Sequence, residues 1–144
     1  MPVEFRTTGL SLGRKLQRLS ADGHKVAREA IKREIENLIH EGFEARAEPR
    51  GRAWKERKID YPWEILEKTG KMRASFRVSA DGPNLIVKNF ATDRGKEYPI
   101  FHQKGWMQGG QKQAARQVMP IKTMPPAWRR RFEKVVRQAL EGLR

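Results

Sequence analysis

The chain has 144 residues, which is enough for one domain with a single core. Hydrophobic residues make up 38% of the sequence and charged residues 33%, a polar composition that still supports folding. The formal net charge of +14 favours polyanionic partners: nucleic acid, an anionic membrane face or an acidic protein surface. The absence of Cys excludes disulfides, thiolate metal sites and Cys nucleophiles. The N-terminal residues 1–6 contain no apolar run, so we expect no signal peptide. No window approaches about 18 apolar residues, so we expect no membrane-spanning helix.

The first predicted element is a helical region over residues 10–43. Apolar residues recur there at helical spacing on both sides of a possible break at residues 20–23. Ser20 or Asp22 is the candidate cap of the second helix. Four glutamates lie on the charged face, and we expect them to pair with Lys and Arg three or four positions away: Glu34, Glu36, Glu41 and Glu44.

A loop is predicted over residues 44–62, because Pro, Gly and charged residues interrupt regular structure there. Trp54 is expected to anchor this loop to the core. Residues 46–58 hold six cations against two anions. Since loops are exposed, this segment, with Arg50 and Arg52, is the better of the candidate electrostatic contacts.

An antiparallel hairpin is predicted over residues 71–90. Met72, Ala74, Phe76 and Val78 alternate with polar residues, which is the period of a half-buried strand. The turn signal lies at residues 81–84, and residues 85–90 form the returning strand.

The segment between this hairpin and the last helix is less regular. Residues 91–97 are a connection, and residues 98–105 fit either a helical turn or a strand. Residues 105–117 contain three Gly and few core-type residues, so we expect a flexible loop or a hairpin arm. Val118 and Met119 are candidates to return to the sheet.

The last predicted element is a helix in which Pro126 suits the first turn. One face of this helix is apolar: Trp128, Phe132, Val135, Val136, Ala139 and Leu143. The predicted fold class is α+β, a single domain over residues 1–144 with N-terminal amphipathic helices, a small antiparallel sheet built on a hairpin, and a C-terminal helix. We expect the helices to cover one face of the sheet and a neighbouring subunit to cover the rest.

No catalytic, cofactor-binding or metal site is predicted. His24, His40 and His102 have no metal-ligand spacing. We interpret His24 and His40 as solvated helix residues, and His102 as a structural residue that bonds a backbone carbonyl or a neighbouring polar group. The sequence marks no Ser, Asp or Glu partner for a catalytic histidine.

Arg129–Arg131 beside Trp128 has two interpretations. The arginines could contact phosphates while the indole stacks on bases. We favour the alternative, in which the arginines form the solvated face of an amphipathic helix and Trp128 lies in the core.

Four elements in a fixed order resemble the phage virion morphogenesis or tail completion protein family. The first is the N-terminal helix that ends in a segment with Phe43, and the second is Pro49-Arg-Gly-Arg-Ala-Trp54. The third is Leu66-Glu-Lys-Thr-Gly-Lys-Met-Arg-Ala-Ser75, and the fourth is Tyr98-Pro-Ile-Phe-His-Gln-Lys-Gly105. The usual last element, Pro-Ala-Arg-Pro-Phe-Leu, is replaced by Met119-Pro-Ile-Lys-Thr-Met-Pro125. There Lys122 keeps the charge of the arginine but loses its bidentate geometry.

The resemblance runs from about residue 10 to about residue 128 and implies a structural protein rather than an enzyme. Its members act in tail completion or head–tail joining as subunits of rings. The implied partners are further copies of the chain and tail tube and head–tail connector proteins, with no membrane. The basic surface fits contact either with DNA or with an acidic protein surface. The implied location is the virion, and the host bacterial cytoplasm during assembly. The candidate assembly residues are Arg50, Arg52, Trp54, Tyr98, His102, Gln103, Trp106 and Lys122.

Two other functions remain open. The net charge and Arg129–Arg131 also fit a small basic nucleic-acid-binding protein, which would bind with a steep salt dependence. A hydrolase that uses His102 is the third and least favoured class.

Overall fold

The computed structural model describes residues 3–6, 21–57, 62, 66–67, 69–81, 84–108, 110–120 and 123–142. The helices are α2 (Ala21–Ala45), α3 (Lys71–Ala74), α4 (Pro99–Lys104) and α5 (Pro126–Glu141). The strands are β1 (Val3–Arg6), β2 (Phe76–Asp81), β3 (Asn84–Asn89), β4 (Thr92–Asp93), β5 (Lys96–Glu97), β6 (Trp106–Gln108) and β7 (Gln111–Gln113). This is an α+β fold with an N-terminal and a C-terminal helix, as predicted.

The helix α2 buries the apolar stripe that the sequence predicts: Ala27, Ile31, Ile35, Leu38, Ile39 and Phe43. It includes Ala21–Gly23, so the predicted break is wrong at these residues, and Asp22 lies in the first turn rather than before it. The helix continues past Gly42 to Ala45. The part of the prediction that falls on residues 10–20, Ser20 included, lies outside the described residues.

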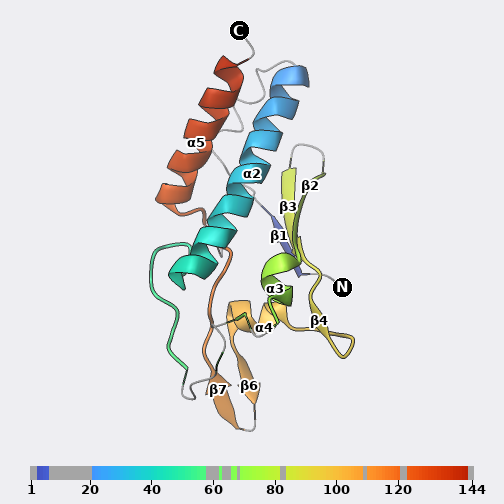
Figure 1. Cartoon of the computed structure of the whole chain (residues 1–144), viewed down its shortest axis with the longest axis vertical. Helices are drawn as coiled ribbons and strands as arrows, with labels where there is room; N and C mark the ends of the chain where they lie inside the picture. Colours follow the sequence, from blue (N-terminus) through green and yellow to red (C-terminus); the bar gives the residue numbers. More distant parts are fainter. Residues whose placement is uncertain are drawn as a thin grey trace.

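The helix α5 begins where the prolines predict. Pro125 precedes it with φ −58° and ψ 140°, and Pro126 occupies the first turn. Trp128, Phe132 and Val136 are buried on its apolar face, which packs along α2. Figure 1 shows α2 between α5 and the sheet. The expectation that both helices cover the sheet is therefore corrected: α2 contacts β2, whereas α5 packs mainly on α2.

The main sheet has three antiparallel strands in the order β1-β3-β2. The predicted hairpin is confirmed, with Val78 opposite Val87 and Asp81 opposite Asn84. The third strand, β1, pairs Arg6 with Ile86 and was not predicted. Because β3 lies between two strands, its backbone groups are paired on both sides. Most of its side chains are buried.

The strand prediction is wrong for Met72 and Ala74, which lie in the short helix α3. This helix follows Gly70, whose backbone is left-handed at φ 68°. Asn89 fixes the helix on the sheet, because its buried amide donates to the carbonyl of Met72 over 2.8 Å. A four-residue alternation did not distinguish this single turn of helix from the start of a strand.

The ambiguous and loop-like segments also take regular forms. Residues 99–104 are the helix α4, and the connection before it contains the small β4–β5 pair. The hairpin β6–β7 occupies most of the predicted loop at 105–117, with Trp106 opposite Gln113. It extends away from the helices at one end of the molecule (Figure 1). Among the helices described, none has the length and apolar character of a membrane-spanning segment.

Candidate functional site

The candidate site is built around residues 114–120, which we call the strap. Val118 and Met119 are buried, but they do not return to the sheet as the sequence suggested. They bond to Gln103 instead, whose side chain is 2% exposed. Its oxygen accepts from the backbone N–H of Val118 over 2.9 Å and of Met119 over 3.2 Å, and its amide donates to the Met119 carbonyl over 2.6 Å. One side chain thus satisfies three buried backbone groups, as a neighbouring strand would.

Trp54 joins the strap to the segment that follows α2. Its ring is buried, which confirms the predicted anchor, and packs edge-on to Phe43 with centroids 5.5 Å apart. The indole N–H donates to the carbonyl of Gln117 over 2.8 Å. Ala47 and Ala53 bridge the two sides of the turn that carries the indole. The aromatic residue therefore contributes both apolar burial and a hydrogen bond.

Residues 46–57, which we call the basic loop, are joined to the strap by Arg116 and to Thr123, beyond the strap, by Arg50. Arg116 donates from Nε to the carbonyl of Lys55 over 2.9 Å, and from its terminal nitrogen to that of Glu56 over 3.4 Å. Arg50 donates to the Thr123 carbonyl over 3.2 Å and also bonds the Thr123 hydroxyl. Arg52 is exposed. The predicted contact loop is thus held in place with its cationic side chains at the surface.

His102 lies on α4, next to Gln103, and its ring packs edge-on to Tyr98 at 5.9 Å. Its carbonyl accepts from the backbone N–H of Arg116 over 2.7 Å. Burial, and secondarily the positive charge of Arg116, lower the pKa of His102 to about 4. The imidazole is therefore neutral at pH 7.

The two remaining candidate assembly residues are Trp106 and Lys122. Trp106 lies in β6, directly after Gly105. Lys122 lies outside the described residues, so its substitution for the arginine of the resemblance stays a sequence observation. Of the predicted residues, Trp54 and Gln103 bond the strap through their side chains, and His102 bonds it through its backbone carbonyl.

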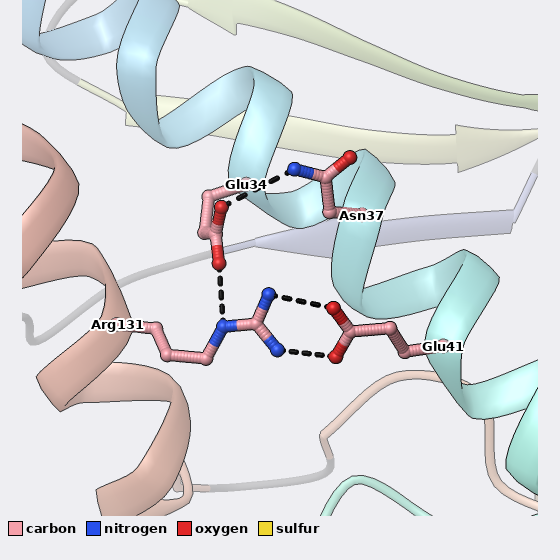
Figure 2. Close-up of polar contacts among 4 residues, drawn as sticks. All are labelled: Glu34, Asn37, Glu41 and Arg131. Carbon is pink, nitrogen blue, oxygen red and sulfur yellow. Dashed lines mark hydrogen bonds and ion pairs between the residues drawn. The ribbon is translucent and has the colours of Figure 1, made fainter.

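Two ion-pair networks hold α2 to its neighbours, and the sequence did not predict either. In the first, Arg131 bonds Glu34 over 2.5 Å and Glu41 through both carboxylate oxygens (Figure 2). Asn37 donates to the same Glu34 carboxylate over 3.3 Å. The hydrogen bonds with Glu41 raise the pKa of Arg131 and lower that of Glu41.

In the second network, Arg73 of α3 bonds Glu44 over 2.6 Å and Glu67 over 2.8 Å. It also donates to Nδ1 of His40 over 3.1 Å and lies over the Phe43 ring at 5.6 Å. The hydrogen bonds from Arg73 lower the pKa of Glu44.

These networks correct two interpretations. Glu34, Glu41 and Glu44 pair with arginines from other elements, not with cations one turn away on their own helix. Arg131 is committed to α2, and Trp128 is buried, so neither is arranged to contact nucleic acid. The favoured alternative is confirmed for the buried indole and for Arg129 and Arg130, which are exposed, but it is wrong for Arg131.

A pocket of about 190 Å³ lies between the end of α2, the basic loop and the start of α5. Leu38, Val118 and Trp128 contribute apolar walls, and Glu41 and Glu48 contribute charge. Its volume is below the roughly 300 Å³ at which ligand pockets begin. Within the described parts of the chain, no group of three His, Asp or Glu side chains is arranged to hold a metal ion.

Comparisons of this chain with protein-family models, with curated proteins and with solved structures found no match.

Proposed function

We propose that this protein is a structural subunit of a phage or prophage virion that acts in tail completion or head–tail joining. In this proposal it forms a ring with further copies of itself and contacts tail tube and connector proteins. It works in the bacterial cytoplasm during assembly and remains in the virion. Its role is to assemble particles, without a catalysed reaction.

The observation that supports the proposal most directly is the convergence on the strap. Trp54 belongs to one element of the resemblance, and His102 and Gln103 belong to another. All three bond to residues 116–119, over sequence separations as long as 63 positions for Trp54 and Gln117. Two elements of the resemblance, and Met119 from the segment in place of the last element, therefore meet at the strap.

The chemistry of His102 favours this proposal over a hydrolase. A general base is most effective when its pKa lies near the working pH, because it must be both unprotonated and basic. The pKa of His102 is lowered to about 4 by burial and then by Arg116, which makes the imidazole a weak base. Its contacts with Tyr98 and the strap give it a packing role.

The hairpin β6–β7 suits a subunit contact. Its two strands pair with each other and with no other strand described here. A two-stranded hairpin is only marginally stable alone, and unpaired strand edges add readily to another chain. A contact between this hairpin and a different face of the next copy is heterologous, which is the geometry that closes rings.

Deletion of the gene, followed by electron microscopy of the particles produced, tests the proposal. We expect heads and tails that are not joined, or tails without a completed end. Normal full-length tails joined to heads would refute it. Complementation with His102→Asn separates the assembly role from the enzymatic alternative: an assembly subunit restores joined particles, whereas a hydrolase that uses His102 does not.

A further inference from the structure

The positive charge of the chain is unevenly distributed. The networks around Arg73 and Arg131 include four carboxylates as ion-pair partners: Glu34, Glu41, Glu44 and Glu67. Because these networks hold only two guanidinium groups, the remaining surface is more basic than the formal net charge of +14 suggests. These carboxylates are bonded to Arg73 and Arg131 between α2, α3 and α5, and Glu41 also lines the pocket beside the basic loop.

Several cationic side chains lie together on the basic loop and at Arg116. Arg50, Arg52 and Lys55 are exposed, while Arg57 and Arg116 are half-buried beside them. Arg116 comes from a position about 60 residues further along the chain and is fixed by two bonds to loop carbonyls. Its pKa is lowered first by burial and then by the positive charge of Arg57, while the carboxylate of Glu56 raises it.

We propose that the basic loop together with Arg116 is a binding surface for the phosphate backbone of double-stranded DNA. Four of its five cationic side chains at positions 50–57 and 116 are arginines, whose planar forks match phosphate oxygens. An anion at this surface offsets the repulsion between Arg57 and Arg116. The proposal does not depend on the tail-assembly function, since a single subunit carries the whole surface.

The surface is unsuited to an acidic protein partner. Protein interfaces have a core that is depleted of charge and enriched in aromatic anchors. The aromatic residue of the basic loop, Trp54, is 3% exposed and faces Phe43 in the core. The exposed apolar side chain that the loop does offer is Ala53. Such a surface provides charge without apolar area, which is the composition that contacts to the nucleic-acid backbone use.

The same observation favours a duplex over a single strand. Proteins that hold single strands stack successive bases on exposed aromatic rings. Among the side chains that the structure describes, the large exposed hydrophobic one is Phe90, which follows β3 and not the basic loop. Without a stacking ring on the loop, binding relies on phosphates, whose charge density is highest on duplex DNA.

Fluorescence anisotropy of the full chain with a short labelled duplex tests the proposal. With four to five phosphate contacts, the logarithm of affinity should fall with the logarithm of salt at a slope of about −4. Affinity then decreases on the order of 100-fold between 50 and 200 mM salt. Failure to bind duplex DNA at 50 mM salt would overturn the proposal.

A pair of matched variants locates the surface. Arg52→Gln/Lys55→Gln removes two exposed charges from the basic loop. Each lost contact costs about 8-fold at 0.1 M salt, so we expect about 50-fold weaker binding and a slope smaller by about 2. Arg129→Gln/Arg130→Gln removes the same charge from the exposed face of α5 and should change affinity by no more than about 3-fold, the residual effect of net charge.

Circular dichroism and thermal unfolding of both variants exclude a folding defect, because all four side chains are exposed. Equal losses in the two variants would mean that binding follows net charge, and would refute the assignment to the basic loop. Tighter binding to a single strand than to the duplex would contradict the choice of duplex DNA. Tighter binding to polyglutamate, with the same loss in the loop variant, would assign the surface to an acidic protein instead.

Discussion

The α2–α5 pair and the strap are stabilised in different ways. The two helices satisfy their own backbone groups and are joined by apolar stripes and by the Arg131 network. The strap has no regular structure, so the side chains of Gln103, Trp54 and Arg116 supply the backbone hydrogen bonds and connections that a strand partner would give. In the helices the backbone hydrogen bonds form without help from side chains. At the strap the buried backbone groups depend on side chains for their hydrogen bonds.

Gln103→Ala should have the largest effect on stability of the substitutions that test this difference. The substitution removes three hydrogen bonds and leaves the buried backbone groups of Val118 and Met119 unsatisfied. At roughly 1–3 kcal/mol for each unsatisfied group, we expect the free energy of unfolding to fall by about 4 kcal/mol. Urea denaturation followed by circular dichroism measures it. Gln138→Ala on the exposed side of α5 is the control and should change stability by less than about 0.5 kcal/mol. A loss below about 1 kcal/mol in Gln103→Ala would mean that water replaces the amide.

Arg131→Met tests the helical region and should have a smaller effect. It leaves Glu34, whose side chain is 10% exposed, without its guanidinium partner, while Asn37 and solvent still contact the carboxylate. We expect a loss of about 2 kcal/mol, less than for a fully buried pair. Arg130→Met, which changes the exposed neighbour in the same way, is the comparison in the same denaturation experiment. Equal stability of the two variants would show that apolar packing alone joins the helices.

His102→Asn tests how the stability of the protein depends on pH. The pKa of His102 is about 4 in the folded protein, lowered by burial and then by Arg116, against 6.5 when exposed. Between these values the unfolded chain binds a proton that the folded protein does not, so this residue makes stability fall as pH decreases from 6.5 to 4. The loss is at most about 3 kcal/mol, and the asparagine variant should not show it.

Unfolding free energies of both proteins at pH 7 and pH 4.5 measure this difference. Losses from carboxylates occur in both proteins and cancel in the comparison. A parallel decline in the two proteins would place the histidine in a solvated position.

The sequence predicted those parts of the fold that follow a period. The stripes of α2 and α5 and the β2–β3 hairpin have enough turns or alternations to be recognised. Trp54 was recognisable because a lone large aromatic residue in a polar loop is commonly buried.

What was missed depends on partners far away in the chain. Arg73 and Arg131 resemble any solvated helix cation until Glu44 and Glu34 are brought to them. Nothing local shows that Gln103 is buried, since its partners are the backbone groups of Val118 and Met119, which have no sequence signature. Four residues at 71–74 were too few to separate a helical turn from a strand.

Gly105 places a steric constraint on the hairpin that follows it. Its backbone is at φ 78°, and a Cβ there would lie 2.7 Å from the carbonyl oxygen of Gln113 and 3.1 Å from the amide nitrogen of Ala115. The base of the hairpin is thus closed by main chain against main chain. Any side chain at position 105 would therefore push the two strands apart where the hairpin begins, whatever side chains the rest of β6 and β7 carry.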